Sequence, residues 1–260
     1  MEVEWRRLRA DELRARAGRD SMAILPLAAL EQHGPHLPVE VDCVLAEAVA
    51  RRTAAALAGS TQVVVLPVVW TGISEHHMGF GGTVTLGFPA YAGLVEEICR
   101  SIVRAGFGRI ALLNGHGGND TALKLLVEEL QPRLAAVLVH TTYWHAAAEA
   151  IALLLEAQDR LLHACEAETS MMLALRPELV DRARIPTGEH GPATDAERAT
   201  AGLHRWRTIA ARSASGVIGV PSAASAEKGE RLLEAIAAAL AARLGRADFW
   251  QLPTRAADEA

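Results

Sequence analysis

Residue types that bind divalent metals are concentrated near the start of the chain, in the stretch EQHGPHLPVEVD at residues 31–42. Glu31 and His33 follow an apolar run that predicts a buried strand, and they leave its end on the same side. The glycine and prolines after them turn the chain, so that Asp42 returns toward the pair. Carboxylates and imidazoles suit a hard or borderline divalent metal, and a carboxylate can bridge two ions with its two oxygens. The stretch therefore predicts part of a metal site whose other ligands come from elsewhere.

Two later segments could complete that site. The stretch NGHGGN at residues 114–119 directly follows a predicted strand. It has neither a Walker lysine nor a GxGxxG register, so its glycines are expected to let the backbone approach a metal or ligand, with His116 pointing at it. The stretch HACEAETS at residues 163–170 places Glu168 in a predicted helix and His163 before it. This pair could supply a metal ligand and a proton shuttle, or it could be an ordinary acidic helix start.

Weaker candidates lie in the glycine-rich loop Gly72–Thr83 and after a later strand. Adjacent residues rarely both reach one metal, so at most one of His76 and His77 is expected to contact a metal directly. Either histidine could instead bind substrate or be solvated on an exposed loop. Trp144 is expected to line a pocket or to pack in the core. No serine lies in a nucleophile-elbow setting, which disfavours a Ser-His-Asp triad.

Strands and helices alternate along the chain and must position these groups. Apolar runs predict strands, and helical periodicity with Gly or Pro stop signals predicts helices. The predicted strands are Met22–Leu27, Val63–Val69, Ile110–Leu113, Ala136–Thr141 and Gly216–Val220; the predicted helices are Val44–Leu57, Pro89–Gly106, Asp120–Leu130, His145–Ala157, Cys165–Leu175 and Ala226–Leu244. This alternation predicts an α/β domain with a mainly parallel sheet. In such folds ligands bind at the carboxyl ends of the strands, so the polar clusters can share one edge.

Composition limits the class of protein. The 260 residues are half hydrophobic, which is enough for one domain over residues 1–260 with a sizeable core. The net charge of −5 lacks the basic footprint of a nucleic-acid binder. The three cysteines are widely spaced without a CxxC pair, which fits a reducing compartment and predicts a cytoplasmic location. No signal peptide is visible and no apolar run reaches the roughly 18 residues that span a bilayer, so no membrane partner is expected.

Taken together, the motifs resemble those of the creatininase family, the creatinine amidohydrolase-like enzymes. The resemblance rests on EQHGPHLPxxxD, a loop similar to GxSxxHMxFxGT, NGHGGN and HAxxxETSxML, which occur in the family's order over about 150 residues. It implies a three-layer α/β/α fold, a binuclear divalent metal centre and hydrolysis of a C–N amide bond. It also implies a closed homo-oligomer, often a hexamer built as a trimer of dimers.

The resemblance also implies roles for individual residues. Glu31, Asp42 and His116 match the ligands of one metal, and His33 and Asp42 match ligands of the other, with Asp42 as the bridge. The ions are expected to be Zn²⁺, with Mn²⁺ or Fe²⁺ exchangeable at one position. His163 matches a proton-transfer histidine, and Ser74 matches a serine that contacts substrate.

This chain departs from creatininases at several of these positions. Gly118 stands where they have a glutamate that serves the second metal, so we expect Glu168 to supply that carboxylate. Gly117 stands where a tyrosine contacts the substrate. Cys165 replaces the usual glycine, His76 a usual glutamate and Gly81 a usual proline. The tryptophan just before the catalytic histidine is not found. Creatinine is therefore a doubtful substrate.

The sequence thus predicts a metal-dependent amidohydrolase that acts on a small amide, cyclic or formylated, through water activated by two ions. His163 would deliver a proton to the leaving nitrogen. Members of the family with NGHGGN include formylamide hydrolases and peptidases that trim a peptide precursor in redox-cofactor biosynthesis. A short-peptide metallopeptidase is therefore the first alternative. A lactone or sugar-acid hydrolase and a non-catalytic metal-binding assembly protein are the others.

Overall fold

A four-stranded parallel sheet forms the centre of the molecule in a computed structural model, which describes residues 2–188, 190–191, 203 and 205–251. Its strands are β1 (Gly18–Leu27), β2 (Val63–Val65), β3 (Phe107–Asn114) and β4 (Val137–Thr142), in the spatial order β2-β1-β3-β4. Parallel neighbours need crossover connections, and helices supply them here. The mainly parallel sheet predicted from the sequence is confirmed.

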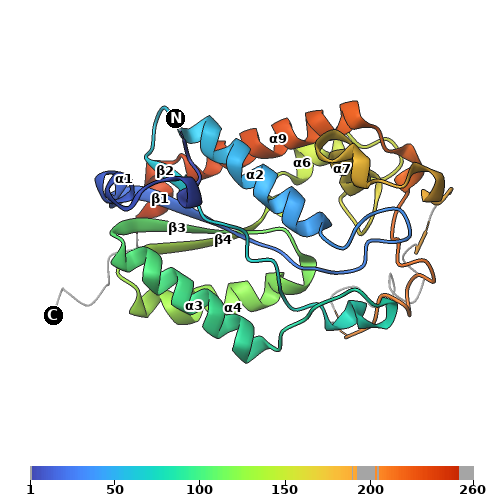
Figure 1. The fold of residues 1–260 in the computed structure, drawn as a ribbon, viewed down its shortest axis with the longest axis horizontal. Helices are drawn as coiled ribbons and strands as arrows, with labels where there is room; N and C mark the ends of the chain where they lie inside the picture. The colour runs from blue at the N-terminus through green and yellow to red at the C-terminus, as the bar shows by residue number, and fades with distance from the viewer. Residues whose placement is uncertain (1, 189, 192–202, 204, 252–260) are drawn as a thin grey trace.

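Helices cover both faces of this sheet, which makes the three-layer α/β/α arrangement (Figure 1). On one face lie α2 (Val41–Leu57), α6 (Ala148–Ala152), α7 (Glu166–Leu175) and α9 (Ala226–Leu244), with α5 (Tyr143–Ala146) beside them. On the other lie α3 (Phe88–Arg104) and α4 (Asp120–Leu130), and α1 (Ala10–Arg16) lies near the amino end of β1. None of the helices among the described residues is long and apolar enough to cross a bilayer.

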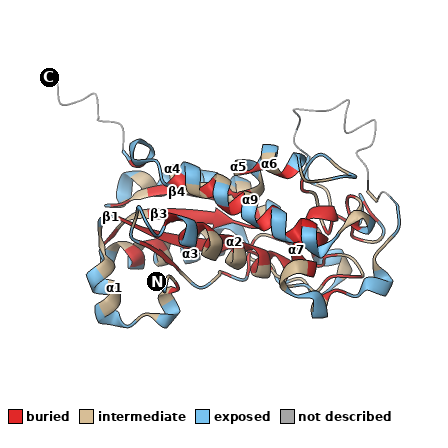
Figure 2. Cartoon of the chain, turned by 90° about the horizontal axis from the view of Figure 1, so that it is seen from above, coloured by how far each residue is buried: buried red, intermediate tan, exposed pale blue. Residues whose placement is uncertain are grey.

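Side chains along each strand point alternately to the two faces of the sheet, which divides the core into two layers. In β1, Met22 and Ile24 pack toward α2 and α9, whereas Ala23 and Leu25 pack toward α3 and α4. Successive side chains on a strand point to opposite faces, and helices cover both faces, so the strand is apolar from Met22 to Leu27, although its first residues, Arg19 to Ser21, are polar. Figure 2 shows the result as a buried sheet between helices that are buried on one side and exposed on the other.

The strand order places a topological switch point between β1 and β3. From β1 the chain crosses to β2 on one side and later returns to β3 on the other. The register pairs Leu27 with Asn114, and the Gly115 amide donates to the Leu27 carbonyl at 2.8 Å. Ligands of open parallel sheets bind in the crevice at such a point. The loops that carry Glu31 and His116 leave the sheet there.

Two predicted strands differ from the structure. The strand expected over Val63–Val69 ends at Val65, because Pro67 has no amide hydrogen to continue the ladder. The strand expected over Gly216–Val220 is wrong. This segment makes only isolated bridges, from Ile218 to His163 and from Gly219 to His190, and does not join the sheet. Both Gly216 and Gly219 have positive φ, which breaks the extended backbone.

Two predicted helices also differ. Helix α2 begins at Val41 rather than Val44, so Asp42 lies in its first turn and not before it. The helix expected over His145–Ala157 is wrong, because the chain forms the short helices α5 and α6 and then a loop. The backbone amides of residues 156 and 157 donate to the Glu166 carboxylate, at 2.8 and 3.0 Å, and not to carbonyls one turn earlier. A side chain distant in sequence therefore ends the helix.

Candidate metal centre

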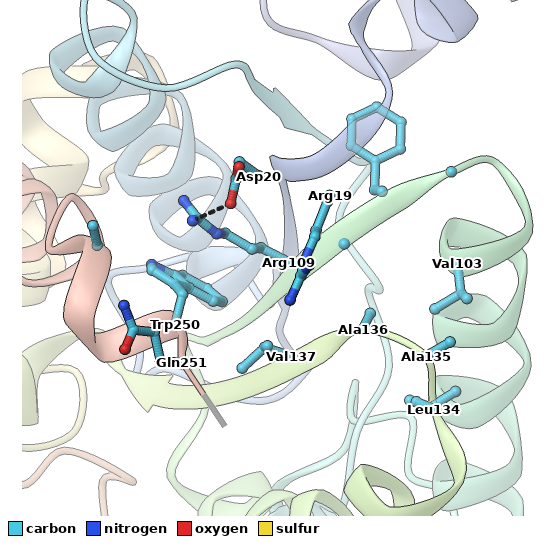
Figure 3. Close-up of a pocket in the computed structure, with 14 residues that line it drawn as sticks. Arg19, Asp20, Val103, Arg109, Leu134, Ala135, Ala136, Val137, Trp250 and Gln251 are labelled. Atoms are coloured by element: carbon cyan, nitrogen blue, oxygen red, sulfur yellow. Dashed lines mark hydrogen bonds and ion pairs between the residues drawn. The ribbon is translucent and has the colours of Figure 1, made fainter. Parts of the chain in front are cut away.

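Two cavities lie at opposite ends of the sheet. The larger, about 1210 Å³, lies at the amino ends of β1, β3 and β4 (Figure 3). Its described lining residues include no histidine, and the one carboxylate among them, Asp20, already pairs with Arg109 at 2.6 Å. The smaller, about 270 Å³, lies at the carboxyl ends and is lined by most of the residues singled out from the sequence. The chemistry of the side chains therefore points to the smaller cavity.

One set of three ligand atoms forms around Glu31, Asp42 and His116. His116 Nδ1 lies 3.0 Å from Glu31 Oε2 and 3.1 Å from Asp42 Oδ2. The opposite ring nitrogen, Nε2, donates to the Ile73 carbonyl at 3.0 Å, which leaves the Nδ1 lone pair directed at the carboxylates. Two ligands that share one ion at about 2.1 Å each lie about 3 to 3.5 Å apart. The spacing suits a shared divalent cation.

A second set forms around His33, Asp42 and Glu168. His33 Nε2 lies 3.3 Å from Asp42 Oδ1 and 4.0 Å from Glu168 Oε1. His33 Nδ1 donates to the Glu31 carbonyl at 3.1 Å, which directs the Nε2 lone pair into the cluster. Asp42 belongs to both sets and presents one oxygen to each, so its position is that of a bridge. A hydrogen bond from the second nitrogen of a histidine is the usual support of a metal-binding imidazole.

Unsatisfied buried atoms mark the same place. Among buried side-chain atoms without a hydrogen-bond partner are Glu31 Oε2, His33 Nε2, Asp42 Oδ2 and Glu168 Oε2. A buried carboxylate without a partner costs free energy, and divalent cations are the usual compensation when several carboxylates converge. The residues present therefore fit two divalent ions.

Electrostatics agree with that fit. Burial opposes a charged imidazole, yet the carboxylates of Asp42, Glu168 and Glu31 raise the pKa of His33 to about 9. Burial likewise opposes charge on His116, but Glu31 and Asp42 hold its pKa well above the usual range. Burial raises the pKa of Glu168 to about 7. The cluster thus has an excess of negative charge that draws in protons, and a divalent cation would replace them.

The backbone excludes a ligand at residue 118. A Cβ atom built on Gly118 would lie 2.1 Å from the Ile73 carbonyl oxygen and 2.4 Å from His116 Nε2. A glutamate at this position would therefore need a different loop. The carboxylate that approaches His33 comes from Glu168, in the first turn of α7. That Glu168 serves the second metal stays a prediction, which this proximity supports.

His163 lies next to both sets and is held by Gln32. Its Nε2 lies 2.9 Å from the Gln32 carbonyl oxygen and 2.9 Å from the Gln32 side-chain nitrogen, and its Nδ1 lies 3.8 Å from Glu31 Oε1. Burial lowers the pKa of His163 well below its usual value, helped by His33 and His77. The next residue, Ala164, is fully buried with a left-handed φ of 51°. A non-glycine residue in that region is strained, and such strain clusters at functional sites.

His77 and Ser74, expected to bind substrate, contact the ligand residues. The Gln32 side-chain amide donates to His77 Nδ1 at 3.0 Å, and His77 Nε2 lies 3.2 Å from Glu31 Oε1. Ser74 is fully buried, and its Oγ lies 3.1 Å from His116 Nε2. In this structure both residues orient metal-ligand side chains. Their contact with substrate stays a prediction.

The cavity wall includes three of the four residues expected to bind substrate and several that sequence reasoning missed. His77, Gly117 and Trp144 line it, whereas Ser74 does not. His76 also lines it, and burial together with the charges of His116 and Arg212 lowers the pKa of His76 to about 4. Leu162 lies in the segment Thr142–Leu162, which was expected to shape the pocket; the missed lining residues are Ile209, Arg212 and Ile218. These three belong to a segment after residue 203 without a motif, so only long-range contacts could have revealed them.

His36 predicts a pH dependence of stability. It is buried, its Nε2 lies 2.9 Å from Thr169 Oγ1, and burial lowers its pKa to about 4. Between pH 6.5 and about 4 the unfolded chain then binds a proton that the folded chain does not, so stability falls as the pH falls. The free energy of unfolding, measured by urea titration, should decrease between pH 7 and pH 5. We expect this decrease to be smaller in His36→Gln than in the wild type. The exposed His145→Gln is the control, and an unchanged loss in His36→Gln would contradict the prediction.

Comparison with known proteins agrees with this geometry. A family model described as creatininase, creatinine amidohydrolase, matches residues 6–244. The chain is 33% identical to the creatinine amidohydrolase of Pseudomonas putida over 251 residues, 90% of each chain. It is 32% identical to the mycofactocin precursor peptide peptidase of Mycolicibacterium smegmatis over 234 residues, 88% of this chain and 85% of the relative.

Solved structures give the same result. The crystal structure of a creatinine amidohydrolase (creatininase) matches with a TM-score of 0.79 and 29% identity, over 97% of this chain and 99% of the other. A creatininase described with Mn and a mutant described as Zn-Zn type match with TM-scores of 0.77 and 0.76, both at 29% identity. They cover 94% of this chain and 98% and 97% of theirs. The chain therefore belongs to the creatininase family.

Proposed function

We propose that this protein is a binuclear metal-dependent hydrolase that cleaves the C–N bond of a small amide. The observation that carries the proposal is the pair of ligand sets that share Asp42 at the base of one small cavity. Glu31, Asp42 and His116 would hold one ion, and His33, Asp42 and Glu168 the other. The donors are oxygen and imidazole nitrogen, which suits Zn²⁺, with Mn²⁺ or Fe²⁺ exchangeable at one position.

When bound, the two ions supply an activated water molecule and polarise the substrate carbonyl. The chain's own residues fix the geometry. The carbonyls of Glu31 and Ile73 hold the ligand imidazoles in one tautomer, and His77 holds Glu31. Such partners orient the ligands, so little reorganisation is needed during the reaction.

His163 is placed to move a proton. With the hydrogen assigned to Nε2, where the Gln32 carbonyl lies at 2.9 Å, Nδ1 is the ring nitrogen next to Glu31 Oε1, at 3.8 Å. Because its pKa is low, the ring is neutral at rest and can accept a proton at Nδ1, then donate it to the leaving nitrogen. Amide hydrolysis needs such a donor, since an unprotonated amide nitrogen is a poor leaving group.

The cavity favours a compact substrate. Its volume of about 270 Å³ lies just below the usual range for ligand pockets, which begins at about 300 Å³. The lining residues Trp144, Leu162 and Ile218 make part of the wall apolar. A small amide with an apolar part therefore fits better than a long, fully enclosed chain.

The second candidate function is hydrolysis near the end of a short peptide. It is favoured by the similarity to mycofactocin precursor peptide peptidases and by a cavity that would take one terminal residue. The cavity is also bordered by an arginine, Arg212, which suits a terminal carboxylate. Both candidates use the same ligand sets and differ only in the substrate beyond the scissile bond.

We further propose that residues 1–260 form one domain, that the protein acts in the cytoplasm, and that it assembles as a closed homo-oligomer, a trimer of dimers. The support is the family resemblance and the composition of the chain. Light scattering coupled to size-exclusion chromatography would measure the assembly directly, and a monomer would contradict the last of these.

The proposed activity can be tested by metal analysis combined with a panel of substrates. The protein is purified without chelator, its Zn, Mn and Fe are measured by mass spectrometry, and it is assayed on cyclic amides, formamides, lactones and short peptides. We expect close to two ions per chain and amide hydrolysis that chelation abolishes and metal restores. Hydrolysis that persists after full chelation, or a protein without metal, would contradict the proposal.

Replacing His163 tests the proton transfer. His163→Ala is expected to lower kcat by about 10²–10⁴-fold, the usual contribution of a general acid–base, while metal content stays unchanged. The fall in kcat should be smaller for amides with a better leaving group, because their C–N bond breaks with less assistance from protonation of the nitrogen. Full turnover of the same amide by His163→Ala would show that another group supplies the proton.

A further inference from the structure

The cavity that holds the ligand sets has one feature that the reaction itself does not use. Among its described lining residues, Arg212 is the only arginine or lysine. The other ionisable side chains on the wall are the carboxylates of Glu31, Asp42 and Glu168 and the histidines around them. The carboxylates are buried in the ligand sets, whereas Arg212 is exposed.

The position of Arg212 is fixed by a short turn. The Ile209 amide donates to the His76 carbonyl at 2.8 Å, which ties the turn to the loop that carries His76 and His77. The amides of Arg212 and Ser213 both donate to the Ile209 carbonyl at 2.8 Å. Ile209 is buried and lines the cavity, so it anchors the turn, and Arg212 lines the cavity on its solvent-exposed side. The arginine is thus attached to the metal centre through its backbone.

We propose that Arg212 binds an anionic group of the substrate, a carboxylate, and so makes the protein selective for amides that carry one beyond the scissile bond. The proposal rests on the proposed hydrolytic function and adds the substrate class. A guanidinium matches a carboxylate with two parallel hydrogen bonds, which gives orientation as well as attraction. With the carboxylate at the entrance and the apolar part against Trp144 and Leu162, the amide would lie toward the ligand sets at the base.

Binding of matched probes tests this proposal. The probes are N-acetyl-L-leucine and its neutral amide, which differ in charge and hardly in size, and their dissociation constants for the metal-loaded protein are measured by calorimetry. We expect the wild type to bind the carboxylate about tenfold tighter. Arg212→Ala should abolish this preference without weakening binding of the neutral probe, and Arg212→Lys should keep part of it, because the charge remains but the planar fork is lost.

A second variant separates the effect of an arginine that lines the cavity from the effect of positive charge elsewhere in the segment. Arg205→Ala removes the same charge from the same segment, at an exposed residue that does not line the cavity, and should leave the preference unchanged. A wild type that binds neither probe, or both equally, would overturn the proposal. So would a preference that survives in Arg212→Ala, because the carboxylate would then bind elsewhere, for example at the metals.

Hydrolysis assays distinguish the two sources of the carboxylate, a small acyl amino acid and a peptide terminus. They also separate failure of the proposed hydrolytic function from failure of the proposed role of Arg212. Faster hydrolysis of N-acetyl-leucine than of a tripeptide that ends in leucine would assign the carboxylate to a small acyl amino acid, and the reverse to a peptide terminus. If the protein holds no metal and cleaves no amide, the proposed function fails. The binding data for the wild type and Arg212→Ala would still decide whether the carboxylate preference depends on Arg212.

Discussion

Asp42→Asn is expected to remove both metal ions and the hydrolytic activity together. Asp42 presents Oδ1 to His33 and Oδ2 to His116, so one substitution removes an anionic ligand from both sets. Asparagine keeps one oxygen, but its NH₂ group would face the other ion. Losing a residue that merely supports a ligand costs about 10–100-fold in metal affinity or activity, so we expect the loss here to exceed about 100-fold.

Metal content by mass spectrometry and amide turnover are the two readouts. Asp20→Asn is the matched control, because it removes a carboxylate at the opposite end of the sheet and should leave both unchanged. Circular dichroism checks that each variant is folded. Two tightly held ions in Asp42→Asn, with normal turnover, would show that Asp42 is not the bridge.

Lys228→Met is expected to lower the free energy of unfolding by about 3–5 kcal/mol. Lys228 Nζ lies 2.5 Å from Glu166 Oε1, and both residues are buried. Removing the lysine leaves the Glu166 carboxylate buried without its counterion, and this uncompensated charge is the main cost. Urea unfolding at pH 7, monitored by circular dichroism, measures the change.

The ion pair between Arg52 and Glu230 provides a control on neighbouring parts of α2 and α9. It is bidentate, at 2.6 and 2.9 Å, but its partners are substantially exposed. Arg52→Met should therefore cost at most about 1 kcal/mol. The double variant Glu166→Gln, Lys228→Met should recover part of the loss of Lys228→Met, because no charge is left unpaired. Equal losses in Lys228→Met and Arg52→Met would contradict the expected role of burial.

Much of the fold could be predicted because its signals are local. The central parts of β1 and β3, Met22–Leu27 and Ile110–Leu113, are continuous apolar runs, since helices cover both faces of the sheet, and α4 and α9 have clear periodicity and ends. The errors arise where a distant group decides the local structure. The Glu166 carboxylate ends the helix after α6, and the bridge of Ile218 to His163 replaces a strand in the sheet.

The candidate site could be predicted to a similar extent. Glu31, Asp42 and His116 follow strands or begin a helix at one edge of the sheet, so motif and topology agree about them. Gln32 was missed because its role is a set of contacts to His77 and His163 that spacing does not reveal. Arg212 was missed for the same reason, since its segment reaches the cavity only through its contact with the loop at His76.

The two ligand sets depend on parts of the chain that are made at different times. The first is complete once β3 and His116 have been synthesised, because β1 and β3 pair directly. The second needs Glu168, and α7 packs mainly against α9, which ends at Leu244. At about 5–20 residues per second, on the order of ten seconds separates these events on the ribosome. If the two sets hold ions as proposed, the site for one ion forms on the nascent chain before the site for the other, so the order of synthesis would set the order of metal loading.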